Sequence, residues 1–186
     1  MARKPSGTEV GAELTDNEGS LLALIVRREP VTAYQLIRTY ETSPVSGFNE
    51  SKGSIYPSIR RLKERKLISA ETVEGDGRNA ERLRSTAAGR EAVKTWVMHM
   101  RPSHALLNDP LRTKIISFDL LSREERLQWI EAARALIQAK IKEVEEYDAR
   151  VSIPFQPLLH QSTLIALRGR LEWLDKVQEA ALAEES

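Results

Sequence analysis

The sequence predicts a mostly α-helical protein with a winged helix-turn-helix domain followed by an all-α C-terminal dimerisation domain. Two observations predict this fold class. Residues 16–100 show three short helical patterns, then a β-hairpin pattern and a fourth helix, which is the element order of a winged helix-turn-helix. Residues 111–186 show only helical patterns, with apolar residues three or four positions apart along two long stretches. A chain of 186 residues has room for two such domains.

The composition limits the classes of function. The chain has no cysteine, which excludes a disulfide framework, a cysteine-ligated zinc site and a thiol nucleophile. Its formal net charge is +1, but residues 51–90 hold ten basic and five acidic side chains, so this segment carries +5 and the remainder −4. Such asymmetry indicates one module that faces a polyanion. The apolar run at residues 21–26 is too short to span a bilayer and no signal peptide precedes it, so we expect a cytoplasmic protein without membrane contact.

The first two helices have recognisable ends. Residues 1–15 lack periodicity and are expected to form a flexible arm. Thr15 or Asp16 can cap a first helix that Pro30 closes. Its buried face is expected to contain Leu21, Leu22, Leu24, Ile25 and Val26. A capping box at residues 32–35 opens a second helix, which buries Leu36 and Ile37 and runs to about residue 42, before a turn-rich linker at residues 43–49.

The third helix is basic and amphipathic. Ile55, Ile59 and Leu62 form its apolar stripe. Pro57 is tolerated without loss of a hydrogen bond only in the first turn, so the helix should begin close to residues 51–54. This start leaves small residues and Tyr56 at an exposed helix N-terminus, where free backbone N–H groups attract phosphate.

The remaining elements follow turn and cap signals. Residues 67–74 and 80–84 flank the turn signal at 75–77 and predict the hairpin, after which Thr86 caps a helix to about residue 100. Residues 101–110 read as a junction between domains. Helices are then expected at 111–121, from a capping box at 122–125 to about 150, and after Pro157. The long helices should pack on each other or on a second copy, and we assign dimerisation to Leu164, Leu167, Leu171 and Leu174.

At these residues the sequence resembles a known family. GSIYPSIRRL followed by ERKLI, and GDGRNAERLRSTAAGREAV, resemble the third helix and the wing with the fourth helix of PadR-family transcriptional regulators. AYQL in the second helix and the tail from residue 110 also resemble the family, the tail resembling the subgroup with a longer C-terminal domain. The resemblance covers about residues 20–180. It implies a homodimeric repressor that binds a pseudo-palindromic operator in double-stranded DNA and is released by a phenolic or other small hydrophobic effector.

The resemblance also implies which residues face DNA. They are Tyr34, Ser51, Lys52, Gly53, Ser54, Tyr56, Pro57, Arg60, Arg61, Arg78 and Arg82. Base reading would fall to Ser54, Tyr56 and Arg60, and phosphate contacts to the wing arginines and Lys52. The wing departs from the family at Asn79, Ala80 and Glu81, where basic or tyrosine side chains are common, and at Ser85.

The sequence also bears on functions other than the binding of double-stranded DNA. The weakly basic wing is compatible with a winged-helix protein-interaction module that does not bind DNA. RNA binding is disfavoured because stacking platforms for unpaired bases are missing. No catalytic motif occurs and His99, His104 and His160 show no metal-ligand spacing, so we expect no enzyme, metal or cofactor. Trp96 and Trp129 are candidates for an effector pocket, although core positions are favoured for both.

Overall fold

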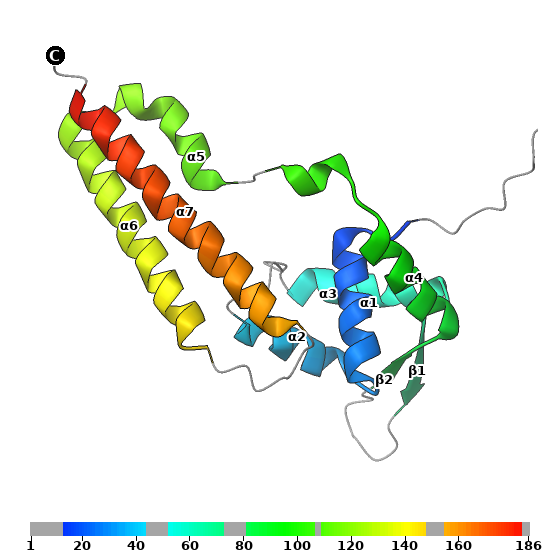
Figure 1. Cartoon of the computed structure of the whole chain (residues 1–186). Coiled ribbons are helices and arrows are strands. Elements are labelled where there is room, and N and C mark those ends of the chain that lie inside the picture. The colour runs from blue at the N-terminus through cyan, green and yellow to red at the C-terminus, as the bar shows by residue number, and fades with distance from the viewer. Residues whose placement is uncertain (1–12, 44–51, 73–80, 107–108, 148–154, 184–186) are drawn as a thin grey trace, which may run out of the picture. The chain divides into compact units, whose positions relative to one another are not determined.

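The computed structural model describes residues 13–43, 52–72, 81–106, 109–147 and 155–183. Within them the chain forms two compact units. The first unit comprises the described residues up to Thr42 together with the described residues between 52 and 105, and the second unit comprises Ser43 and the described residues from Leu106 onward. The division between Ala105 and Leu106 lies in the segment 101–110. Figure 1 shows the helices and strands of both units.

Capping boxes define how the first unit begins. Helix α1 spans Asp16–Arg28, and its cap is Thr15, whose side chain accepts from the backbone N–H of Glu18 while the Glu18 carboxylate accepts from Thr15 N–H. Helix α2 spans Ala33–Thr42, where Gln35 and Thr32 make the predicted reciprocal pair. Leu14 is buried in the core, so the expected flexible arm has to end before it. Residues 1–12 of that arm and residues 44–49 of the linker lie outside the described residues.

Helix α3 spans Lys52–Glu64, so it begins where the sequence predicted, but the argument from proline was wrong. Pro57 is the sixth helical residue and therefore lies in the second turn. A proline at that position cannot donate to the carbonyl oxygen of Gly53, four residues earlier, so the helix tolerates one missing backbone hydrogen bond near its start. Ser51 lies outside the described residues.

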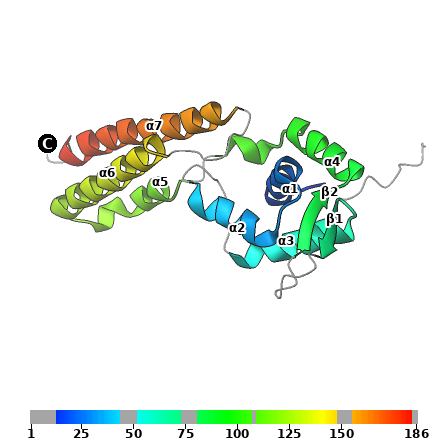
Figure 2. The same cartoon turned by 90° about the horizontal axis from the view of Figure 1, so that it is seen from below.

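The hairpin and the fourth helix follow as predicted. Strands β1, Ile68–Thr72, and β2, Glu81–Ser85, are antiparallel, with Ile68 opposite Ser85 and Thr72 opposite Glu81. Figure 2 shows the two strands side by side. Val31 exchanges two backbone hydrogen bonds with Leu83, which ties the segment between α1 and α2 to the hairpin. The turn at residues 73–80 lies outside the described residues.

Helix α4, Ala87–Met98, is capped by Thr86, whose hydroxyl accepts from Gly89 N–H at 3.0 Å. A Cβ atom at Gly89 would lie 2.1 Å from the carbonyl oxygen of Leu67, so only glycine lets α4 approach the end of α3 so closely. The helix ends two residues before the predicted end. A short 3-10 helix, η1, follows at Pro102–Ala105.

The core of the first unit is formed by the apolar faces of α1, α2 and α3 together with the strands. Its fully or almost fully buried members include Leu21, Leu22, Ile25, Leu36, Ile55, Ile59, Leu62 and Leu83. Leu24 and Val26, which were expected in the buried face of α1, are only half buried. The core therefore presses one face of α3 against α1 and α2 and leaves the other face exposed.

The second unit is a pair of long helices with a short helical segment against it. Helix α6, Arg123–Glu145, opens with the predicted capping box at Ser122 and ends about one turn earlier than predicted, and α7 spans Gln156–Ala183. Figure 1 shows α6 and α7 side by side. The single helix predicted at 111–121 is instead α5, Pro110–Lys114, followed by the 3-10 helix η2, Ile115–Leu120, because Ser117 has non-helical backbone angles.

Candidate nucleic-acid interface

Helix α3 has two faces of opposite character. Ile55, Ile59 and Leu62 are buried, with exposed fractions of 6% or less. Tyr56 is 56% exposed, and the side chain of Arg60 is 77% exposed. Because Tyr56 and Arg60 are four residues apart, they lie on the same outward face, one turn from each other. Within the part of the chain that the structure describes, Arg60 makes a long i,i+4 contact to Glu64, at 3.8 Å, and its exposed guanidinium can reach another partner.

The beginning of α3 offers backbone donors beside that face. The first N–H groups of a helix have no intrahelical acceptor and carry a partial positive charge, which makes the helix start a place for an anionic oxygen. Lys52 and Gly53 form the first turn, although nothing is described of the Lys52 side chain. Ser54 is half buried and has an interaction of its own in the structure.

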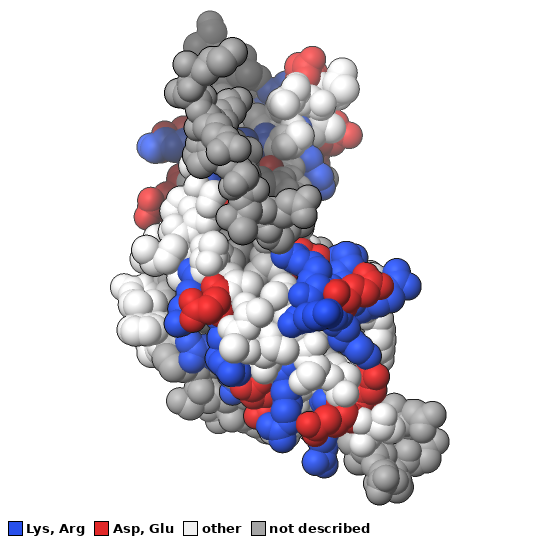
Figure 3. Space-filling model, turned by 90° about the vertical axis from the view of Figure 1, so that its right-hand side faces the viewer, with Lys and Arg blue, Asp and Glu red and all other residues white. Residues whose placement is uncertain are grey.

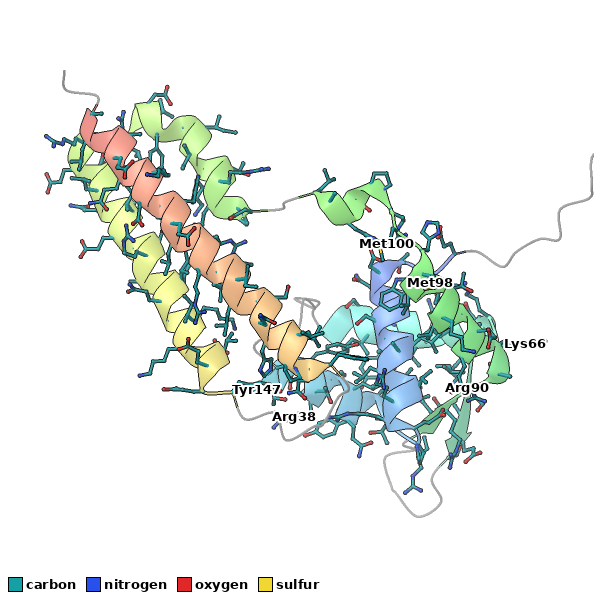
Figure 4. The ribbon with its side chains drawn as sticks, viewed as in Figure 1. Arg38, Lys66, Arg90, Met98, Met100 and Tyr147 are labelled. Atoms are coloured by element: carbon teal, nitrogen blue, oxygen red, sulfur yellow. The ribbon has the colours of Figure 1, made fainter. Side chains whose placement is uncertain are left out.

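Helix α2 adds an aromatic and a basic side chain. Tyr34 is 67% exposed, as expected for a residue that touches a partner molecule. Arg38 lies four residues later on the same face, with a 58% exposed side chain that contacts Glu41 at 3.5 Å. Sequence reasoning missed Arg38, although its spacing from Tyr34 was a signal that could have found it. Figure 4 labels Arg38.

Arg61 was predicted to face DNA, and the structure gives it another role. Its Nε donates to Glu18 Oε1 at 2.7 Å, and one terminal nitrogen donates to the hydroxyl of Ser58 at 3.0 Å. Glu18 is only 5% exposed and also accepts from Arg65 at 3.4 Å. A buried carboxylate needs charged partners, so α1 holds both arginines against the protein. Lys63 is likewise engaged, by Glu81 of β2 at 2.8 Å.

Glu18 consequently has a perturbed acidity. Burial raises the pKa of its carboxyl, but the hydrogen bonds from Arg61 and Thr15 and the charges of Arg61 and Arg65 outweigh this effect, so the pKa lies below the ordinary value of 4.5. A carboxylate whose pKa falls on folding stabilises the fold fully above its unfolded pKa. That contribution is lost as the pH falls through the folded pKa.

We therefore expect Glu18→Gln to lower the free energy of unfolding by about 1–3 kcal/mol near neutral pH, the range for hydrogen bonds to charged groups. The difference from the wild type should shrink as the pH falls below 4.5, where Glu18 of the unfolded chain binds a proton, and should disappear below the lowered pKa of the folded carboxyl. Denaturant titrations of both proteins across this range measure the effect. Glu172→Gln, at an exposed position of α7, is the matched control, and a difference that does not change with pH would contradict the assignment.

The wing carries mixed charge. Arg82 is exposed and opposite Glu71 in the hairpin register, and Arg84 contacts Glu71 at 3.8 Å. Arg78 lies outside the described residues. Figure 3 shows basic and acidic side chains interspersed on the face in view, without one continuous basic patch. Of the predicted wing contacts, the structure thus describes only Arg82.

Trp96 and Trp129, the candidates for an effector pocket, lie in different units. Trp96 packs against the core of the first unit, and its Nε1 donates to Asp16. Trp129 packs against the core of the second unit, where its ring meets Phe118 edge to face at a centroid distance of 4.9 Å. Each tryptophan therefore has a packing role within its own unit, and a shared pocket stays a prediction.

The four leucines assigned to dimerisation lie inside the second unit. Leu174 is fully buried and Leu167 is 7% exposed, both packed with Ile137 and Val144 of α6. Leu164 and Leu171 are partly buried against the same cluster. The leucine spacing indicated a helix face that packs on another helix, and the structure shows such a face. The helix that covers these leucines is α6 of the same chain.

The described residues contain no group of three or more histidine, cysteine or acidic side chains that could hold a metal ion. In the same part of the chain, no helix is long and apolar enough to cross a membrane.

Comparison with known proteins gives a family match over part of the chain and a fold match over most of it. Residues 21–95 match the model of the transcriptional regulator PadR-like family. Bacillus subtilis PadR in complex with operator DNA has a TM-score of 0.75 at 18% identity, over 89% of this chain and 98% of that one. The same protein in complex with p-coumaric acid gives 0.71 at 16%, over 88% and 97%. The PadR-like transcriptional regulator BC1756 from Bacillus cereus gives 0.70 at 18%, over 94% and 99%.

No curated protein matches the chain significantly. The structural likeness at these identities concerns the fold, and it extends over both the winged helix and the C-terminal helices. The family match covers the helices and strands that carry the exposed face of α3. Residues 21–95 are thus similar to the PadR-like family of transcriptional regulators, and the chain has the fold of the solved PadR structures.

Proposed function

We propose that the protein is a sequence-specific regulator that binds double-stranded DNA as a homodimer and acts as a repressor. The observation that carries the proposal is the outward face of α3, where Tyr56 and Arg60 lie next to a helix start while the opposite face is fixed in the core. The first residues of a recognition helix contact base edges in the major groove. The structure of Bacillus subtilis PadR with operator DNA supports the same use of the fold.

In this proposal the residues divide between base reading and backbone contact. Tyr56, Arg60 and Ser54 are assigned to base edges, since they lie on the first turns of α3. Tyr34 and Arg38 of α2, with Arg82 of the wing, are assigned to the sugar-phosphate backbone. Lys52, Gly53 and Pro57 lie in the first two turns of α3 and form its start. Ser51 and Arg78 lie outside the described residues, so their assignment to DNA contact rests on the sequence. Arg61 is withdrawn from the contact set because Glu18 and Ser58 hold it.

A homodimer would place two such faces on two half-sites about one helical turn apart. The surface that we propose for the second copy is the side of α7 opposite its intrachain seam. Leu158 and Ile165 are seven residues apart on that side and are 58% and 62% exposed. Gly169, one turn further, has open space around it. Apolar side chains exposed in this way are typical of a surface that another molecule covers.

We expect Ile165→Glu to shift the protein from dimer to monomer, because a charge in the centre of an apolar interface loses its hydration without gaining a partner. Sedimentation velocity over a range of protein concentrations measures the change. The control is Glu131→Lys, an exposed charge change on the neighbouring helix α6. A variant that remains as dimeric as the wild type would place the dimer interface elsewhere.

A small aromatic effector completes the proposal. Bacillus subtilis PadR has been solved in complex with p-coumaric acid, which supports a phenolic class of ligand for this fold. An effector releases DNA only if it binds better to a dimer arrangement that fits the operator poorly. Trp96 and Trp129 remain the candidates for its site, because both rings are only partly buried.

The experiment that tests the function is a fluorescence-anisotropy titration of DNA upstream of the protein's own gene against scrambled DNA, at two salt concentrations. The expected result is tight and sequence-dependent binding by two protomers, weakened by salt because phosphate neutralisation releases counterions. Equal and weak binding to both DNAs would contradict specific recognition at that site. Addition of p-coumaric acid and related phenolic acids to the bound complex then tests effector release.

A protein-interaction module without DNA binding is the second candidate. It is favoured by one observation, namely that Arg61, Arg65 and Lys63 are engaged by acidic side chains of the protein itself. Heparin chromatography at low salt separates the two candidates. A DNA-binding protein is retained on the column, whereas a module with neutralised basic residues elutes early.

A further inference from the structure

One carboxylate connects the start of α1 to the residues that follow α4. Asp16 Oδ1 accepts from the indole N–H of Trp96 at 3.2 Å and from a terminal nitrogen of Arg101 at 2.5 Å. Nε2 of His104 lies 3.3 Å from the same oxygen. We name these four residues, Asp16, Trp96, Arg101 and His104, the Asp16 clamp. They bring together a helix start, the last turns of α4 and the 3-10 helix η1.

Neighbouring contacts hold the same segment. His99 Nε2 lies 3.0 Å from the carboxylate of Glu13, and the backbone N–H of Arg101 donates to Nδ1 of His104 at 3.3 Å. Gly19 lets the Trp96 ring lie directly on α1, since a Cβ atom at that position would be 2.3 Å from the ring. Residues 99–105 are thus held by the carboxylates of Glu13, which precedes α1, and of Asp16, at its first turn.

Apolar burial does not explain the position of this segment. Met98 is 80% exposed, Met100 is 76% exposed, and Leu106 is 75% exposed. Figure 4 labels the two methionines at the end of α4 and directly after it. The hydrophobic contribution there is therefore small, and the polar contacts of the Asp16 clamp are the ones that fix the chain.

Asp16 is also not required to cap its own helix. Thr15 and Glu18 form the capping box of α1, and Asp16 adds only a favourable charge in the first turn. The clamp contacts are consequently an additional feature of this carboxylate. They lie where the chain leaves the first unit, since the second unit begins at Leu106.

We infer that Asp16 is a positioning residue that, through the Asp16 clamp, fixes how the chain leaves the first unit and thereby the half-site spacing that a dimer accepts. The inference rests on the proposed function. In a dimer joined through the second units, freedom in residues 99–105 becomes freedom in the separation of the two α3 helices. Such freedom lowers the effective concentration of the second helix at the correct spacing and raises it at incorrect spacings.

The test uses the full-length protein and the operator found by the titration described above. Asp16→Ala and Arg101→Ala each remove one side of the shortest contact in the clamp. Asn17→Ala, in the same exposed turn of α1, is the matched control. Affinity is measured for the operator, for a variant operator with its half-sites moved apart by about half a helical turn, roughly 5 bp, and for a single half-site.

We expect both clamp variants to reduce the preference for the natural spacing by about fivefold or more, within the range of coupling between sites, while single half-site affinity stays at the wild-type value. Asn17→Ala should keep the wild-type preference. Hydrogen exchange provides a readout without DNA. The backbone amides of residues 99–105 should exchange faster in the clamp variants than in the wild type, and Asn17→Ala should exchange like the wild type.

Three other outcomes would count against the inference. Wild-type spacing preference in both clamp variants would overturn the inference and leave the proposed function standing. Equal losses on the operator and on the single half-site would also overturn it, because they indicate a damaged first unit. If the wild type itself shows no specific binding, the proposed function and the inference fail together. Thermal melts identify a variant that does not fold, in which case the other clamp variant decides the test.

Discussion

Tyr56→Ala combined with Arg60→Ala is expected to abolish specific operator binding while the protein stays folded and dimeric. Both side chains are mostly exposed and lie outside the core of the first unit, so their removal should leave that core intact. A good base contact contributes about 1–3 kcal/mol of discrimination, so the loss of two should weaken specific binding on the order of 100-fold or more. Fluorescence anisotropy with operator and scrambled DNA measures the change.

The control for this experiment is Arg168→Ala, which removes an exposed arginine of α7 in the second unit. It changes the net charge by as much as Arg60→Ala but should leave operator affinity within twofold of the wild type, as is usual for a charge outside the contact set. Circular dichroism and sedimentation establish that fold and dimer are intact. Full operator affinity in the double variant would refute the assignment of α3 as the recognition helix.

The second large effect concerns stability. Leu174 is fully buried between α7 and α6, so Leu174→Ala should lower the free energy of unfolding by about 2–5 kcal/mol, the usual range for a buried leucine. Denaturant unfolding at one fixed protein concentration measures the loss, because dimer association also contributes to stability. Leu136→Ala, at a 65% exposed position of α6, is the matched control and should cost about 0.5 kcal/mol or less.

Leu174→Ala distinguishes packing of α7 on α6 of the same chain from packing of α7 on a second copy of the chain. If Leu174 belonged to an interface between copies, its truncation would act chiefly on association and would resemble Ile165→Glu in sedimentation. If it belongs to the intrachain seam, the dimer should persist under native conditions while the second unit melts earlier. A variant with wild-type stability and weakened association would therefore overturn the placement of α7 against α6.

The local structure could be predicted where a signal acts over a few residues. The capping boxes at residues 32–35 and 122–125 lie at the starts of α2 and α6, and the alternating pattern on both sides of residues 75–77 gave the hairpin strands. These features depend on residues that are three or four positions apart, so they can be identified from the sequence alone. The outward position of Tyr56 followed in the same way, from the period of the helix.

Long-range pairs could not be predicted in this manner. Glu18 had no role in the sequence analysis, yet it binds Arg61, 43 positions later, because folding brings α1 onto α3. Nothing in the pattern of α3 distinguishes Arg60, which is exposed, from its neighbour Arg61, which is engaged. The partner of the α7 leucines was open for the same reason, since a heptad pattern describes a face and not the molecule that covers it.

The pairing of Glu18 with Arg61 and Arg65 has a consequence for how such a regulator would distribute itself over a genome. Affinity for random DNA is set mainly by the number of phosphates that free cations neutralise. Because two arginines of this region are already bound to a carboxylate, fewer cations contribute to that affinity. A smaller share of the protein is then sequestered on the roughly 10⁶–10⁹ competing sites of a genome. Occupancy of the operator is reached with fewer molecules per cell.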